Sequence, residues 1–234
     1  ELAGAILYPD DRSGDAHLFC QDLYRMLQDK GVAFHFGASV ESIVVRDNTA
    51  TGVLTQEGEL AADHIVIAAG SYVTPLLRAI GIKAPVQPVK GYSITVPMPV
   101  GPHSLSTPIV DDHLHAVVTP LTDAIRVAGT AEFAGFDLSL SPKRISNLRA
   151  LLGSVMPNLR FDERDVRPWC GLRPMSSDGV PIIGHAGLRN LWINTGHGHL
   201  GWTMAAGSGR LLAELLTGQP PSINPAPYAL DRFS

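Results

Sequence analysis

The stretch LWINTGHGHLGWTMAAGSG, residues 191–209, decides the fold class of this chain. Leu191–Asn194 is a short apolar run typical of a buried strand, and Trp202–Leu216 is rich in Ala and Leu, as expected of a helix. Thr195–Gly201 lies between them and is a glycine-rich turn. A strand, a tight turn and a helix in this order predict an α/β unit whose helix N-terminus faces a ligand.

Two interpretations of the glycine turn are open at this point. Gly196, Gly198 and Gly201 match the pattern G-x-G-x-x-G, which in nucleotide-binding folds lets backbone amides hold a pyrophosphate. That role requires a second parallel strand and an acidic residue about 20 residues further on, where this chain has QPPSIN. We therefore expect the turn to face an electron-rich group of a ligand, and we do not expect it to be the first phosphate-binding site. The alternative is that the glycines serve only a sharp turn and close helix packing.

Another strand followed by a turn precedes this unit in the chain. His64–Ala69 is continuously apolar, which predicts a strand covered on both faces, as in a parallel sheet. The strand is expected to end at Gly70 and Ser71, and a short helix is expected over Tyr72–Ile80.

The N-terminal third predicts one helix and several short strands. Asp11 and Ser13 are candidate N-caps for an amphipathic helix that ends at Lys30 and Gly31. The β-rich runs, separated by turn residues, are Val32–Phe36, Val40–Arg46 and Thr51–Gln56.

Prolines mark a domain crossing between Lys83 and Pro108, because they exclude a helix and confine strands to edges or short pieces. Antiparallel strands are expected beyond the start of this segment, at Tyr92–Val96, Ala116–Thr119 and Ala124–Ala128. Ser141, with Pro142 at the first helical position, is expected to open a helix.

Composition excludes several classes of function. The 234 residues suffice for one to two domains with a hydrophobic core, and no apolar run reaches the ~18 residues of a membrane span. The net charge is −4 and no Lys/Arg block occurs, which argues against a nucleic-acid partner. Cys20 and Cys170 are the two cysteines, so neither a disulfide framework nor a Cys-based zinc site is expected. The chain begins at Glu1 without a signal-peptide pattern, which suggests a processed or truncated chain.

Two histidine pairs raise the alternative of a metal site. His113 and His115, and also His197 and His199, could each place two imidazoles on one face of a strand. The second pair lies in the glycine turn and no carboxylate completes a ligand set, so no metal is predicted. Nucleophilic acyl chemistry has little support, because Cys170 lies in an apolar segment and no G-x-S-x-G motif occurs.

Three motifs give the chain a specific resemblance. PVKGYSITVP (residues 88–97), GLRPMSSDGVPIIG (171–184) and residues 191–209 resemble the C-terminal part of the flavoprotein D-amino-acid dehydrogenases, within the glycine oxidase, sarcosine oxidase and D-amino-acid oxidase family. The resemblance runs from Gly4 to the last helix. It does not include the N-terminal βαβ unit with which that family holds the FAD pyrophosphate, and the chain is therefore expected to be a fragment.

The resemblance implies an α/β plus α+β fold with interleaved connectivity. Residues 1–85 and 171–234 would form part of an FAD-binding domain that keeps a remnant of a parallel sheet. Residues 86–170 would form a substrate-binding domain of mostly antiparallel sheet and helices.

Substrate-binding residues are also implied. Arg173 corresponds to the arginine that holds the substrate carboxylate in the family, and a guanidinium can grip a carboxylate with two parallel hydrogen bonds. That grip would direct the Cα–H bond towards flavin N5. The alternative for Arg173 is a surface ion pair. The aromatic residue that many oxidases place over the substrate has no clear counterpart in the matching strand, residues 113–120, and Tyr92 is an alternative donor to the substrate. His199 stands where relatives have an arginine or a small polar residue.

FAD is the implied cofactor. Val40 matches the position whose backbone meets the adenine, and Gly171 and Leu172 would lie beside the flavin. The other implied cofactor-binding residues are Ala68, Ala69, Gly70, His197, Gly198, His199, Leu200, Gly201, Trp202 and Thr203. The last seven would present backbone amides near the flavin pyrimidine end, where negative charge develops on reduction.

The implied activity is FAD-dependent oxidation of D-amino acids to 2-oxo acids and ammonia. The electrons would pass to a respiratory acceptor, expected to be a quinone, at the inner face of the membrane. The enzyme would be cytoplasmic, with peripheral association at the inner face of the bacterial inner membrane left open. Two alternatives are an amine oxidase of the glycine or sarcosine type that uses O₂, and a catalytically inert fragment that holds little or no FAD and self-associates. The preferred D-amino acid and the oligomeric state do not follow from the sequence.

Overall fold

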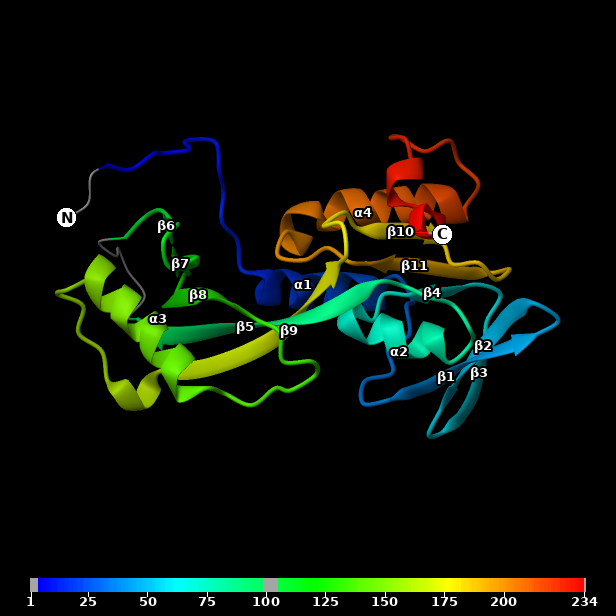
Figure 1. Cartoon of the computed structure of the whole chain (residues 1–234), viewed down its shortest axis with the longest axis horizontal. Coiled ribbons are helices and arrows are strands. Elements are labelled where there is room, and N and C mark those ends of the chain that lie inside the picture. Colours follow the sequence, from blue (N-terminus) through cyan, green and yellow to red (C-terminus); the bar gives the residue numbers. More distant parts are fainter. Residues whose placement is uncertain (1–3, 99–104, 234) are drawn as a thin grey trace. The chain divides into compact units, whose positions relative to one another are not determined.

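The computed structural model of the chain describes residues 4–98 and 105–233 (Figure 1). It divides into two compact units, each built from three separate segments. Unit 1 consists of Glu1–Ala33, Tyr92–Thr130 and Leu140–Cys170. Unit 2 consists of Phe34–Gly91, Ala131–Ser139 and Gly171–Ser234. This division is geometric, and the assignment of residues 1–85, 86–170 and 171–234 to cofactor and substrate domains stays a prediction.

The fold is mixed, as predicted, with parallel and antiparallel strand pairs and helices between them. Within the described ranges the α-helices are α1 (Ala16–Asp29), α2 (Val73–Arg78), α3 (Pro142–Val155) and α4 (Gly201–Leu216). The strands are β1 (Val40–Arg46), β2 (Thr49–Thr55), β3 (Gly58–Ala61), β4 (Ile65–Ile67), β5 (Val86–Pro97), β6 (Ile109–Asp111), β7 (Ala116–Pro120), β8 (Ala124–Glu132), β9 (Arg167–Ser176), β10 (Ile182–His185) and β11 (Leu191–Thr195).

Unit 2 contains the parallel strand pair that the apolar runs indicate. β4 and β11 are parallel, with Ile65 opposite Leu191, and β10 joins β11 antiparallel in the order β10-β11-β4. Ile65 and Leu191 are buried in the core of this unit, whereas Val66 is 41% exposed. The expectation that both faces of this strand are covered is therefore wrong for the described chain, because only one face packs against the core.

A second sheet of unit 2 follows the turn residues of the sequence. β1, β2 and β3 form an antiparallel sheet, and the first hairpin turns at Asp47 and Asn48, whose φ angles are 47° and 57°. Such left-handed angles are tolerated by Asp and Asn better than by other side chains. β3, which sequence patterns did not indicate, begins at Gly58, with φ 123°.

Unit 1 is built around α3 and a five-stranded sheet of order β6-β7-β8-β5-β9. α3 begins at Pro142 after Ser141, as predicted, and its buried face meets strand residues such as Val118 and Ile125. The helix side chains that form this face are Ile145, Leu148, Leu151 and Leu152. β5, β8 and β9 extend beyond the limits of unit 1 into residues of unit 2.

Two strand predictions are corrected by the structure. Val32–Phe36 is not a strand, because a β-rich run needs a hydrogen-bonded neighbour and none pairs with it in the described chain. β5 is not a short or edge strand, since it runs over twelve residues and lies between β8 and β9. Pro88 removes one ladder N–H, and burial of the nearby residues Val86 and Val89 offsets that loss.

α1 has the predicted C-terminus and a different N-cap. Asp15, rather than Asp11 or Ser13, accepts hydrogen bonds from the backbone N–H groups of His17 and Leu18. A carboxylate at this position satisfies helix N–H groups that have no partner within the helix. None of the residues of α1 is buried.

We expect Leu151→Ala to lower the free energy of unfolding of unit 1 by about 2–5 kcal/mol, because truncation leaves a cavity in a packed core. The Leu151 side chain is 1% exposed. Leu114 is in the same unit and 48% exposed, so Leu114→Ala is the matched control and should change stability by about 0.5 kcal/mol or less. Urea unfolding followed by circular dichroism measures both. Equal losses would contradict this assignment of the core.

Candidate functional site

Arg173 lies on β9 within unit 2, one residue before Pro174. Its side chain is half-buried, and burial lowers the pKa of the guanidinium from its ordinary value. The group nevertheless stays charged at neutral pH, because an arginine is not deprotonated in proteins. Its guanidinium lies against the backbone of Gly91 in β5, where an added Cβ would overlap it. Arg173 is thus a positive charge that is partly shielded from water.

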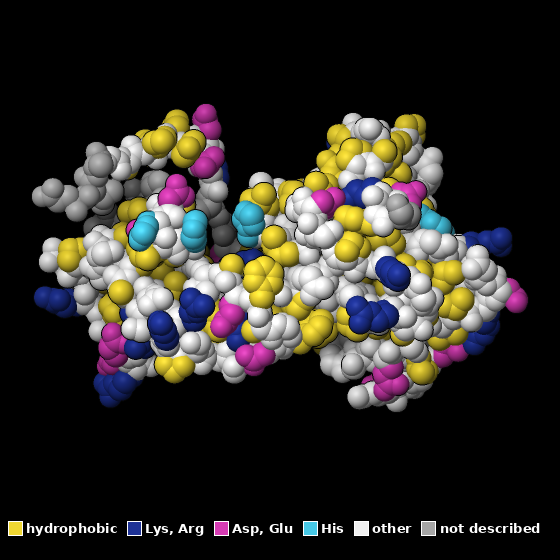
Figure 2. Space-filling view, in the orientation of Figure 1, with side chains coloured by type: hydrophobic (Ala, Val, Ile, Leu, Met, Phe, Trp, Pro, Cys, Tyr) yellow, Lys and Arg dark blue, Asp and Glu magenta, His cyan; other side chains and the backbone are white. Residues whose placement is uncertain are grey.

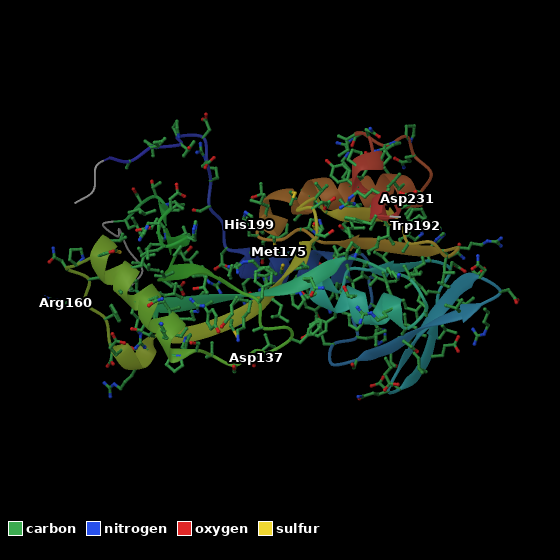
Figure 3. All side chains as sticks on the ribbon, viewed as in Figure 1. Asp137, Arg160, Met175, Trp192, His199 and Asp231 are labelled. Carbon is green, nitrogen blue, oxygen red and sulfur yellow. The ribbon has the colours of Figure 1, made fainter. Side chains whose placement is uncertain are left out.

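The glycine turn is joined to the strand that carries Arg173. The N–H of Gly198 donates to the carbonyl of Pro174 at 2.9 Å, and Met175 and His197 form an antiparallel bridge. A Cβ on Gly198 would lie 2.7 Å from Met175 Sδ, and the φ of Gly198 is 56°, so both the close approach and the backbone conformation favour glycine. Figure 3 shows Met175 and His199 close to the start of α4. Two segments far apart in the sequence therefore meet at the N-terminus of that helix.

His197 fixes the turn to the body of α4. Its Nε2 atom lies 2.9 Å from Ser208 Oγ, at hydrogen-bond distance. Burial lowers the pKa of His197 from its ordinary value, which favours the neutral imidazole. His199, Leu200, Trp202 and Thr203 are exposed on the same turn and the first turn of α4. Their side chains are therefore open to solvent in the described chain.

Three buried polar atoms around this turn have no hydrogen-bond partner among the described residues: Ser71 Oγ, Ser176 Oγ and Asn194 Oδ1. They belong to adjoining segments, because Thr195 Oγ1 donates to the carbonyl of Gly70 at 2.9 Å and a Cβ on Gly196 would lie 3.2 Å from that of Ser176. Buried polar groups are normally satisfied. A polar ligand or bound water is the kind of group that fits these atoms.

A pocket of about 470 Å³ lies in unit 2 at the start of β1. Its lining brings together two of the residues implied as cofactor-binding, Val40 and Ala69. The other lining residues are Ser39, Glu41, Tyr72, Pro75 and Leu76. Ligand pockets commonly measure about 300–1,000 Å³ and are mostly apolar with a few polar groups, so this lining fits an adenine-sized group.

The other implied residues are distributed less closely. Gly171 and Leu172 are half-buried beside Arg173 on β9, while Ala68 is exposed at the end of β4. Gly70 has φ 55°, a left-handed angle that favours glycine. Tyr92 is 1% exposed within the hydrophobic cluster of unit 1, so burial does not favour it as a donor to substrate, and its role stays a prediction.

Sequence reasoning missed Ser71, Ser176 and Asn194, because a buried serine or asparagine has no signature in a single sequence. It also did not assign a role to Gly91 or Lys90, although both lie in the motif PVKGYSITVP. Their importance arises from contacts between segments distant in the chain, which no spacing rule reports.

Potential metal ligands do not cluster in residues 4–98 and 105–233. No group of three or more His, Cys, Asp or Glu residues there could hold a metal ion. No helix in those ranges is long and apolar enough to cross a membrane. On the face shown in Figure 2, basic side chains occur in separate groups with acidic side chains among them.

Comparison with known proteins identifies the family of this chain. The family described as FAD dependent oxidoreductase, DAO, matches residues 1–215. A D-amino acid dehydrogenase of Vibrio vulnificus (strain CMCP6) is 44% identical over 234 residues, covering 100% of this chain and 56% of the relative. One of Granulibacter bethesdensis is 42% identical, with the same coverage of both chains. The chain thus spans 56% of the length of these curated relatives.

Solved structures with a similar fold include two oxidases. Iminodiacetate oxidase from Chelativorans sp. BNC1 has a TM-score of 0.80 and 25% identity, covering 92% of this chain and 58% of that one. Glycine oxidase from Geobacillus kaustophilus has a TM-score of 0.74 and 25% identity, covering 86% of this chain and 53% of that one. With the family match over residues 1–215, these likenesses establish that the chain belongs to the DAO family of FAD dependent oxidoreductases.

Proposed function

We propose that the protein containing this chain oxidises the Cα–N bond of D-amino acids with FAD. Hydride leaves Cα and a proton leaves nitrogen, giving an imino acid that water hydrolyses to a 2-oxo acid and ammonia. The observation that carries the proposal is the half-buried Arg173 guanidinium on β9, the strand whose backbone is bonded to the glycine turn. The names of the curated relatives, D-amino acid dehydrogenase, support this choice of substrate.

Arg173 is the residue proposed to bind the substrate carboxylate. Two parallel charge-assisted hydrogen bonds would fix both the position and the rotation of the amino acid. Partial burial strengthens this attraction, because less water screens it. An amine that enters neutral needs no side chain to remove its proton, so the proposal assigns no catalytic base.

The cofactor is proposed to bind to two places in unit 2, the pocket at the start of β1 and the glycine turn before α4. Val40 and Ala69 would meet the adenine end in the pocket at β1. Backbone amides within residues 197–203, at the positive end of α4, would face the flavin end, together with Gly171 and Leu172. The amides of Gly198 and Leu200 are not among these donors, because they already donate to the carbonyls of Pro174 and His197. When bound, FAD supplies the acceptor for the hydride.

The final electron acceptor is proposed to be a respiratory quinone, with the enzyme on the cytoplasmic side of the membrane. The dehydrogenase names of the relatives support an acceptor other than O₂.

Arg173→Ala in the full-length enzyme should raise the KM for D-alanine about 100-fold or more, because it removes two charge-assisted hydrogen bonds of about 1.5–3 kcal/mol each. FAD content should stay nearly unchanged. Steady-state kinetics and the absorbance of released flavin measure the two quantities. Arg173→Lys keeps the charge but not the planar fork, and it should give an intermediate KM. An unaltered KM in Arg173→Ala would remove the residue from this role.

A second candidate is an amine oxidase that passes electrons to O₂, and the structural likeness to iminodiacetate oxidase and glycine oxidase favours it. With D-alanine as substrate, the dehydrogenase proposal predicts 2-oxo acid without equivalent hydrogen peroxide. A peroxidase-coupled assay measures this, with an added quinone as the alternative acceptor. Peroxide in a one-to-one ratio with the 2-oxo acid would favour the oxidase instead.

We expect stability to fall on acidification through His197. Its pKa is lowered in the fold from the ordinary 6.5, so below about pH 6.5 the unfolded chain takes up the proton first and unfolding becomes more favourable. His197→Asn should therefore lose less melting temperature than the wild type between about pH 7.5 and about pH 5.5. His199→Asn, on the exposed side of the turn, is the control and should keep the wild-type dependence. A full wild-type loss in His197→Asn would contradict the assignment.

A further inference from the structure

The guanidinium of Arg173 lies where the side chain of residue 91 would otherwise be. A Cβ built on Gly91 would overlap Nη1, Cζ and Nη2 of Arg173. Gly91 does not adopt the left-handed angles that usually require glycine, since its φ is not among the positive ones of the chain. The local backbone conformation therefore does not demand a glycine here, and the space occupied by Arg173 does.

β5 is anchored at Lys90, the residue before Gly91. Lys90, adjacent to Gly91, is 2% exposed, and its Nζ donates to Asp137 Oδ2 at 2.8 Å and to the carbonyl of Ser139 at 3.0 Å. Glu132 lies 3.7 Å from the same ammonium. A buried ammonium that lost these partners would be strongly destabilising, so β5 resists movement at Lys90. Asp137, labelled in Figure 3, belongs to the segment after β8 that provides this anchor.

The neighbouring strands restrict β5 in the same way. β5 lies between β8 and β9 in its sheet and is hydrogen-bonded to both. The guanidinium, by contrast, is at the end of a flexible side chain. If a side chain were added at residue 91, the guanidinium of Arg173 would move and the backbone would stay.

We propose that Gly91 is a positioning residue for Arg173. The missing side chain forms a slot that holds the guanidinium in one place and so sets the affinity for the carboxylate of the substrate. This inference rests on the proposed function, in which Arg173 binds that carboxylate. It adds that carboxylate binding needs the Arg173 charge in a particular position, and that Gly91 of β5 sets this position.

Gly91→Ala in the full-length, FAD-loaded enzyme tests the slot. The KM for D-alanine and the Kd for benzoate, a carboxylate probe followed by flavin absorbance, should each rise about tenfold or more, which corresponds to 1.4 kcal/mol. The kcat at saturating D-alanine should change much less than KM, and FAD content should be retained. Gly153→Ala, at a helix position where a Cβ meets nothing within 4 Å, is the control and should match the wild type.

A double-mutant cycle separates positioning from general damage. In the Arg173→Ala background, Gly91→Ala should change neither KM nor Kd further, because the displaced group is gone. The melting temperature of this chain, measured without cofactor or substrate, should fall with Gly91→Ala alone and fall less when Arg173 is already alanine. This second readout remains usable if Gly91→Ala loads FAD poorly.

The outcomes distinguish the two proposals. If Arg173→Ala leaves KM and Kd unchanged, the carboxylate role in the proposed function is wrong. If Arg173→Ala raises them and Gly91→Ala does not, or if the two changes multiply in the double variant, the slot is wrong and the carboxylate role stands.

Discussion

The backbone hydrogen bond from Gly198 to Pro174 is the interaction on which the candidate site depends. It joins the turn before α4 to the strand that carries Arg173. The N-terminus of α4 and the guanidinium are therefore held by two segments that are bonded to each other. Both are positive, one as a partial charge of aligned peptide dipoles and one as a full charge. The pair is suited to ligands that are anionic or become so, such as a carboxylate and a reduced flavin. A Cβ on Gly198 would lie 2.7 Å from the Met175 sulfur, so glycine lets the turn lie against this strand without displacing that side chain.

β5 meets two opposite requirements at consecutive residues. Lys90 is a buried charge that needs several partners. The Lys90 ammonium and Ser139 lower the pKa of the Asp137 carboxyl group well below its usual range, so this carboxylate stays ionised at neutral pH. Gly91 must have no side chain at all, because Arg173 occupies that space. Successive residues of a strand point to opposite faces, so one strand can satisfy both requirements. The anchor on one face thus supports the slot on the other.

Local sequence patterns predicted an element correctly where the residues of that segment alone determine its structure. α3 follows from Ser141, Pro142 and an apolar stripe, and β11 with α4 follows from an apolar run, glycines and a run of helix-forming residues. β5 was misjudged, because its prolines argue locally against a long central strand while burial between two neighbours argues for it. In the same way, Val32–Phe36 has strand-forming residues and no strand to pair with in the described chain.

The same distinction between local and tertiary information applies to the candidate site. The amino-acid sequence alone determined the strand, glycine turn and helix, and its motifs marked Arg173 by resemblance to a family. Only the tertiary structure decided that Arg173 lies against Gly91 and that Val40 and Ala69 line one pocket. It also decided that three buried side-chain atoms near the turn, Ser71 Oγ, Ser176 Oγ and Asn194 Oδ1, have no hydrogen-bond partner among the described residues. The physical reason is that helix and turn preferences act between residues close in the chain. Space, burial and unsatisfied hydrogen bonds are instead properties of segments that meet only after folding.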